Sequence, residues 1–104
     1  MQGQTPKYIP FLEACGNILK LNPTISLSIA AYTDSVGDEE FNLELSQRRA
    51  QAVVDFFIDF EIDNEQLIGT GLGQQDLLNP DITEEDNAEN RRALLELIGV
   101  MEDA

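Results

Sequence analysis

Four of the six positive charges in this 104-residue chain come as two arginine pairs, Arg48–Arg49 and Arg91–Arg92. The chain also contains 20 Asp and Glu residues, which give a net charge of -14. If the chain holds an anion, these pairs are where it can do so, because a guanidinium forms two parallel hydrogen bonds to one carboxylate or phosphate. The elements that carry the arginines decide which of them could reach a common ligand.

The first pair lies in a segment, residues 39–60, whose apolar periodicity predicts a helix. A step of about 100° per residue places five apolar residues on one face: Leu45, Val53, Phe56, Phe57 and Phe60. The opposite face holds Glu44, Arg48, Gln51, Asp55 and Asp59. We therefore expect Arg48 to pair with Glu44 on the surface, whereas Arg49 should point inward, in line with Asn42 and Leu45.

An inward arginine needs a partner, since a guanidinium that is buried and unpaired is strongly destabilising. Asp34 is the candidate, because it lies in the polar stretch 33–37, directly before the helix that carries Arg49. A carboxylate and a guanidinium that lie near each other without being fused would bind a zwitterion, one taking an ammonium group and the other a carboxylate. A ligand resembling an amino acid fits this arrangement, and a local salt bridge without function is the alternative.

Two predicted strands flank this helix. Residues 24–32 alternate apolar residues with small or polar ones, a pattern typical of a half-buried strand, and residues 65–73 form a glycine-rich second candidate. Strand, helix and strand in this order predict a right-handed crossover between parallel strands, with the polar stretch 33–37 at the ligand-binding end. The glycines Gly69, Gly71 and Gly73 do not match a dinucleotide-binding loop, because no amphipathic helix follows them directly.

The N-terminal segment repeats apolar residues at helical spacing. This pattern predicts a helix that starts at about Pro6 or Pro10 and ends at Leu21. Cys15 falls in the apolar stripe of this helix, so we expect a buried thiol rather than a reactive one.

The C-terminal part begins with a polar segment, residues 74–89, and continues into Asn90–Val100, which is apolar on both faces after Arg92. Periodicity leaves helix and strand open for this last segment, because its leucines favour a helix and its final Gly-Val favours a strand. The length of the chain fits a single domain.

Composition excludes several classes of function. A net charge of -14 argues against binding to nucleic acid, and the absence of an apolar run of 18 residues predicts no direct membrane insertion. Without histidine and with one cysteine, His/Cys zinc sites and Ser-His or Cys-His nucleophiles are ruled out. The acidic stretches beginning at Asp34 and Asp59 lack EF-hand ligands at required positions. We therefore expect no cofactor and no metal, and a binding module rather than an enzyme.

The stretch Thr33–Val53 resembles the central motif of OmpA-like C-terminal domains, which also occur in Pal lipoproteins and MotB stators. The family pattern T-D-x-x-G, then N-x-x-L-S-x-x-R-A-x-x-V, is present as Thr33-Asp34-Ser35-Val36-Gly37, Asn42, Leu45-Ser46, Arg49-Ala50 and Val53. GTGLGQQD is similar to the glycine-rich segment after the second helix of the family, and NRRALLELI resembles its closing NRR motif, which is a strand. The resemblance covers roughly residues 6–100.

The resemblance implies an α/β fold of βαβαβ type, an α+β sandwich with helices packed on a mixed sheet, over one domain of residues 1–104. It also implies non-covalent binding of the peptide stem of peptidoglycan. In the family, the aspartate of T-D and the arginine of R-A hold the ammonium and carboxylate of diaminopimelate, and the matching residues here are Asp34 and Arg49. Thr33 and Asn42 match neighbours of the ligand, and Arg91 and Arg92 are implied to line or steady the same cleft.

The family opens with a strand before its first helix, whereas here only MQGQ precedes Thr5. We therefore expect a sheet edge open to pairing, and a homodimer through that edge as a further partner. The alternative function is an OmpA-like scaffold for protein interaction or dimerisation, without affinity for the cell wall. The resemblance places the domain in the periplasm, as part of an outer-membrane or envelope-anchored protein that binds peptidoglycan.

Overall fold

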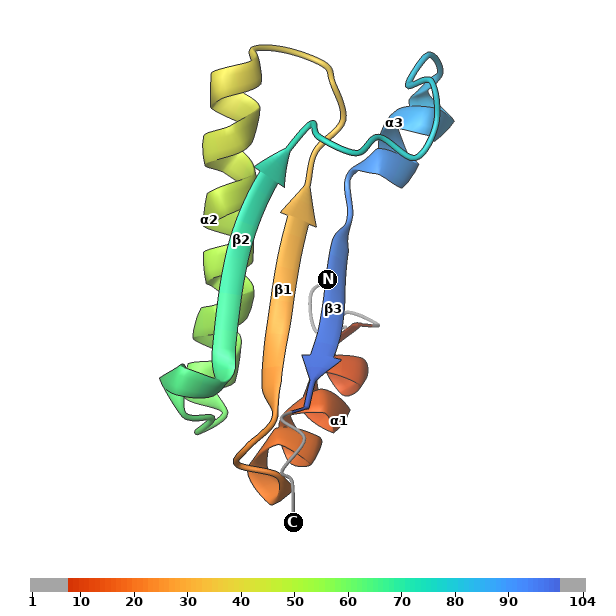
Figure 1. The fold of residues 1–104 in the computed structure, drawn as a ribbon. Coiled ribbons are helices and arrows are strands. Elements are labelled where there is room, and N and C mark those ends of the chain that lie inside the picture. The colour runs from red at the N-terminus through yellow and green to blue at the C-terminus, as the bar shows by residue number, and fades with distance from the viewer. Residues whose placement is uncertain (1–7, 100–104) are drawn as a thin grey trace, which may run out of the picture.

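The structure, a computed structural model, describes residues 8–99. Its elements are α1 (Tyr8–Leu21), β1 (Ser26–Tyr32), α2 (Glu39–Asp59), the short 3-10 helix η1 (Asn64–Gln66), β2 (Leu67–Gly73), α3 (Glu84–Asn90) and β3 (Ala93–Ile98). The three strands lie side by side, α2 runs along the sheet beside β2, and α3 lies beyond the end of the sheet where β1 and β2 finish (Figure 1). The expected combination of a mixed sheet and packed helices is confirmed.

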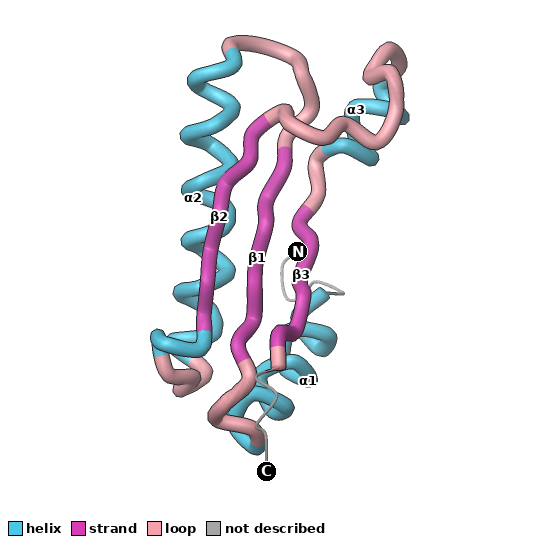
Figure 2. Tube along the Cα trace, viewed as in Figure 1, coloured by secondary structure: helices cyan, strands magenta, loops and turns pink. Residues whose placement is uncertain are grey.

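The sheet has the order β2-β1-β3, so the first strand in the chain is central (Figure 2). β1 and β2 are parallel, with Leu27 opposite Leu67, and β3 is antiparallel to β1, with Leu27 opposite Leu97. The predicted parallel pair is confirmed. The segment after Arg92 is a strand, as the resemblance implies and periodicity alone does not decide.

The core lies on one face of β1. Leu27 and Ile29 are fully buried, and the residues that alternate with them along the strand are only partly buried, as the alternating pattern predicts. Side chains from α1 and α2 cover this face: Leu12, Cys15, Leu19, Ala50, Val54 and Phe57. Cys15 is buried in this core, as expected, and its burial raises the pKa of the thiol. Of the two predicted starts of α1, Pro6 lies outside the described residues. The described helix runs from Tyr8 to Leu21, the predicted end.

Helix α2 begins after Asp38, whose carboxylate accepts a hydrogen bond of 2.9 Å from the backbone N–H of Phe41. The helix packs directly on the backbone of β2, because a Cβ on Gly71 would lie 2.2 Å from the backbone nitrogen of Gln47. A Cβ on Gly69 would similarly lie 2.8 Å from a methyl group of Val54. The glycine-rich strand thus serves close packing between helix and strand.

This close packing corrects the predicted inner face of α2. The residues buried along the helix are Asn42, Ser46, Ala50, Val54 and Phe57. Of the five apolar residues expected there, Phe57 is fully buried and the other four are only partly buried. Because the two backbones approach closely near Gly71, the buried face of α2 carries the small residues Ser46 and Ala50 there, and the larger Phe57 is buried further along the helix.

The polar segment after β2 contains α3, a helix that the sequence analysis did not predict. Thr83 caps it: its hydroxyl accepts from the backbone N–H of Asp86, while the Asp86 carboxylate accepts from the backbone of Thr83. The seven residues of α3 carry three acids in the first turn, which suit the unpaired N–H groups there. The helix leads directly into Arg91 and Arg92 ahead of β3.

Among the strands of residues 8–99, β3 pairs only with β1, and it exposes Leu94, Leu97 and Ile98. The strand that the family has before its first helix would fall outside the described residues. Within residues 8–99, no helix is both long enough and apolar enough to span a bilayer.

Candidate functional site

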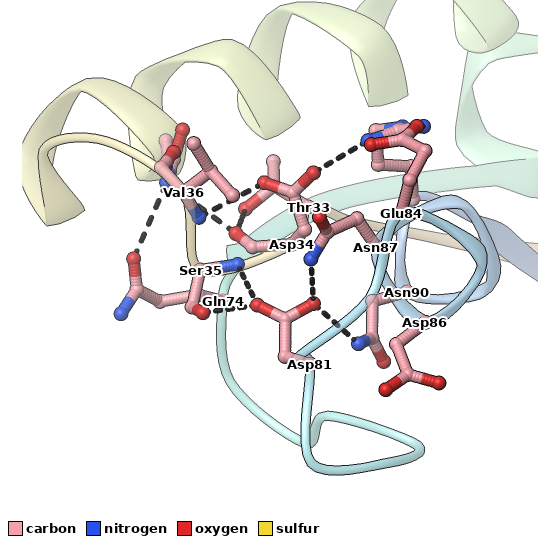
Figure 3. A network of polar contacts seen from close by, with 12 residues as sticks. Thr33, Asp34, Ser35, Val36, Gln74, Asp81, Glu84, Asp86, Asn87 and Asn90 are labelled. Carbon is pink, nitrogen blue, oxygen red and sulfur yellow. Dashed lines mark hydrogen bonds and ion pairs between the residues drawn. The ribbon is translucent and has the colours of Figure 1, made fainter.

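Asp34 lies at the carboxyl end of the central strand and is held on both carboxylate oxygens. One oxygen accepts a hydrogen bond of 3.1 Å from the backbone N–H of Val36 (Figure 3). The other accepts one of 2.6 Å from the guanidinium of Arg91. Arg91 also donates to Glu84 at 2.8 Å. The hydrogen bonds to Glu84 and Asp34 raise the pKa of Arg91 above its ordinary value. Only 11% of the Asp34 side chain is exposed, whereas 37% of the Arg91 side chain is, so the pair lies at the boundary with solvent.

The alternative of a local salt bridge between Asp34 and Arg49 is wrong, because the ion-pair partner of Asp34 is Arg91. Arg49 is exposed, and it makes no ion pair with any residue in the range 8–99. It belongs to the flank of α2 beside Val53, since the line facing the sheet runs through Ser46 and Ala50. The predicted surface pair is confirmed: Arg48 and Glu44 lie 4.0 Å apart and both are exposed.

Three arginines line one open groove of about 680 Å³: Arg49, Arg91 and Arg92. The remaining lining residues are apolar or aromatic: Phe11, Leu12, Ala31, Tyr32, Ala52, Val53, Ala93 and Leu95. The groove therefore runs from α1 across the ends of β1 and β3 to α2. Arg91 reaches from this groove to Asp34, so the acidic and basic candidates meet at its rim.

Arg92 lies against the ring of Tyr32, with its guanidinium carbon 3.8 Å from the ring centre. Its two terminal nitrogens donate to backbone carbonyls, at 3.3 Å to Asn90 and at 3.0 Å to Asp76. Its Nε is buried and has no partner within the described part of the chain. Arg92 thus holds the loop after β2 close to β3 and keeps a positive charge on the groove wall.

Thr33 and Asn42 hold the loop that carries Asp34. The amide of Asn42 donates to the carbonyls of Asp34 and Val36, at 3.4 and 3.1 Å, and to the side chain of Gln74 at 3.2 Å. The hydroxyl of Thr33 donates to the Asp34 carbonyl at 2.8 Å. Both residues are buried, so their visible contribution is to fix the backbone around Asp34.

Asp81 is a member of this network that the sequence analysis did not select. Its carboxylate accepts from the backbone N–H of Ser35 at 2.7 Å and from the Ser35 hydroxyl. It also accepts from the amides of Asn87, at 2.5 Å, and Asn90, at 2.9 Å. These hydrogen bonds, that of the Ser35 hydroxyl first, hold the pKa of Asp81 well below its usual range. Asp81 thereby ties the α3 region to the loop of Asp34.

One sequence signal could have pointed to this region. Thr83-Glu84-Glu85-Asp86 has the spacing of a capping box, which marks the start of a helix. A helix so placed brings Asn87 and Asn90 to one side, three residues apart, where both reach Asp81. In the described range, no group of three or more acidic or cysteine side chains is arranged to hold a metal ion.

The fold and this site define a small α/β domain, with a groove lined by guanidinium groups at the carboxyl end of its central strand. The model of the OmpA family matches residues 5–91, and the chain belongs to that family. The resemblance found in the T-D, R-A and NRR motifs is thereby confirmed.

Several known proteins are similar to this chain in sequence, and a solved structure is similar to it in fold. The probable lipoprotein YiaD of Escherichia coli K12 is 34% identical over 83% of this chain and 39% of its own length. The peptidoglycan-associated lipoprotein of Legionella pneumophila is 31% identical over 83% of this chain and 49% of its own length. The crystal structure of the peptidoglycan-associated lipoprotein from Burkholderia pseudomallei superimposes with a TM-score of 0.85, at 30% identity over 89% of this chain and 79% of that one. The chain thus spans less than half of the first two relatives.

Proposed function

We propose that this domain binds peptidoglycan non-covalently and thereby anchors a parent envelope protein to the cell wall from the periplasm. Two kinds of relative support the proposal by name: peptidoglycan-associated lipoproteins and the peptidoglycan-binding protein ArfA of Mycobacterium tuberculosis, which is 31% identical over 84% of this chain. The proposed activity is binding alone, without catalysis and without a cofactor.

The observation that carries the proposal is the contact of Asp34 with Arg91 at the rim of the arginine-lined groove. In a chain of net charge -14, a fixed carboxylate beside several guanidinium groups suits a ligand that carries both signs of charge. We assign the ammonium of the diaminopimelate side chain to Asp34 and the neighbouring carboxylate to Arg49. Thr33 and Asn42 would position Asp34, while Arg91 and Arg92 would line the cleft.

Sedimentation with purified sacculi tests this function. The wild-type protein should pellet with sacculi whose stems contain diaminopimelate, whereas Asp34→Ala and Arg49→Ala should remain largely in the supernatant. Arg48→Ala is the matched control, because Arg48 neighbours Arg49 and pairs only with Glu44 on the surface. Equal pelleting of all four proteins would contradict the proposal. Equal pelleting of the wild type with lysine-type sacculi would contradict only the assignment to diaminopimelate.

A second candidate function is self-association through the open edge of the sheet. It is favoured by β3, which pairs only with β1 in the part of the chain that the structure describes and exposes Leu94 and Ile98. Sedimentation velocity over a wide range of protein concentrations should then show a dimer that Leu94→Lys weakens. A strict monomer at all concentrations would rule this function out.

A further inference from the structure

The groove contains more positive charge than the residues around it balance. Arg91 is matched by two carboxylates, those of Asp34 at 2.6 Å and Glu84 at 2.8 Å. Arg49 and Arg92 line the same groove, yet neither makes an ion pair with a residue of the range 8–99. Two guanidinium charges therefore face one groove without a carboxylate from the described chain, although the protein has 20 acids.

Arg92 is held in place before any ligand arrives. It stacks on Tyr32 and donates to two backbone carbonyls, those of Asn90 and Asp76. A guanidinium has five N–H donors, so these two hydrogen bonds leave three of them unused: the buried Nε–H and two N–H groups of the terminal nitrogens. Because the side chain is already ordered, a ligand that binds to it loses little affinity to the ordering of this group.

The zwitterionic end of diaminopimelate engages only one of the two unmatched arginines. On the proposed function, Asp34 binds the ammonium and Arg49 binds the carboxylate next to it, which leaves Arg92. We infer that the groove recognises a second carboxylate of the same stem peptide, and that Arg92 binds it. This inference rests on the proposed function and specifies its ligand: a short peptide with one ammonium and two carboxylates.

The apolar part of the groove offers a surface for the small side chains of a peptide. Ala31 and Ala93 lie opposite each other on β1 and β3, and they line the groove together with Ala52 and larger apolar side chains such as Val53 and Leu95. Methyl groups of alanine residues in a stem would bury apolar area there. A stem peptide offers two candidates for the second carboxylate. One is the carboxylate of the D-glutamate before diaminopimelate, and the other is the second carboxylate of diaminopimelate when it ends the stem.

Calorimetric titration of the full chain with soluble stem tripeptides separates these sources. Three forms of L-Ala-γ-D-Glu-meso-diaminopimelate are compared: unmodified, amidated at the glutamate carboxylate, and amidated at the terminal carboxylate of diaminopimelate. One amide should bind about tenfold more weakly than the unmodified peptide, since it loses a charge-assisted hydrogen bond. The same ratio should persist in Arg48→Gln and fall to about one in Arg92→Gln.

The ratio is taken within each variant, so a partial loss of folding in Arg92→Gln does not produce it. If that variant fails to fold, the Nε–H resonance of Arg92 in the wild type provides the answer by NMR: it should shift with the unmodified peptide and less with the weaker amide. Equal affinity for all three peptides, or an unchanged ratio in Arg92→Gln, would overturn the second carboxylate site alone. Failure of the unmodified peptide to bind, or unimpaired binding by Asp34→Ala, would overturn the proposed function as well.

Discussion

Asp81 accepts hydrogen bonds from three residues, Ser35, Asn87 and Asn90, and so joins two segments far apart in the sequence. Asp81→Asn replaces one acceptor oxygen by a donor amide, which faces donors that are already in place. We expect a melting temperature several degrees lower at pH 7, because buried donors lose their acceptor. Circular dichroism measures this loss. Glu85→Gln is the control, since Glu85 is an exposed acid of the same region without a side-chain hydrogen bond in the described chain.

The pH dependence of the Asp81 effect follows from the sign of its pKa shift. The folded-state pKa of Asp81 is lowered, so its ionised form stabilises the protein fully above the unfolded pKa of about 4. That contribution is lost as the pH falls below about 4 toward the folded value. The difference in melting temperature between wild type and Asp81→Asn should therefore be constant from about pH 7 to 5 and shrink below about 4. A difference that grows on acidification would contradict this assignment.

At the scale of residues, the sequence predicts which charged side chains lie near one another better than it predicts their ion pairs. Asp34 and the arginines were selected because charge in an acidic chain and motif spacing both point to them, and Arg91, Arg92 and Arg49 do line one groove. The partner of Asp34 was missed, because Arg91 is 57 positions away and no local periodicity reports such a contact. The inward direction assigned to Arg49 failed for a different reason: helical geometry gives relative directions, while packing against β2 decides which of them is buried.

At the scale of elements, the contact between α2 and β2 depends on glycine. Gly71→Ala would place a methyl carbon 2.2 Å from the backbone nitrogen of Gln47, so the helix would have to move away from the strand. We expect a loss of about 1–3 kcal/mol or more in unfolding free energy. Urea denaturation measures it. Gly99→Ala is the matched control, since nothing lies within 4 Å of the added carbon there, and an equal loss in both variants would contradict the packing argument.

The strength of the apolar pattern in each segment explains which elements could be predicted. β1 and α2 have strong patterns and a clear cap at Asp38, and both lie where the sequence places them. The helix α3 was missed because it is seven residues long and has no apolar stripe; its buried residues are Asn87 and Asn90. Periodicity leaves β3 undecided, since a strand with many exposed leucines alternates little. The resemblance to the family implies a strand, and the pairing with β1 confirms it.

At the scale of the whole molecule, negative charge opposes folding. A net charge of -14 is spread over a body whose principal dimensions are 49 × 40 × 20 Å. At about 0.01 M salt the screening length is about 30 Å, so carboxylates on opposite sides of the molecule repel one another. At about 1 M salt it falls to about 3 Å, and this repulsion disappears. Stability should therefore rise with sodium chloride over the low part of this range.

An acid should be most destabilising where it is repelled both by the other carboxylates and by the negative end of a helix dipole. Asp59 is exposed, ends α2, and lies in a last turn that has no basic residue. Asp59→Lys should raise the unfolding free energy by about 0.3–1 kcal/mol at low salt, since a cation there meets unpaired carbonyls and reduces the net charge. Glu39→Lys makes the same charge change in the first turn and should destabilise, because it opposes the dipole. Urea denaturation at low and high salt distinguishes the contributions: a gain common to both variants reports net charge, whereas opposite signs that converge at high salt report the dipole. Two variants with the same sign and size at low salt would show that the position of an acid along α2 does not matter.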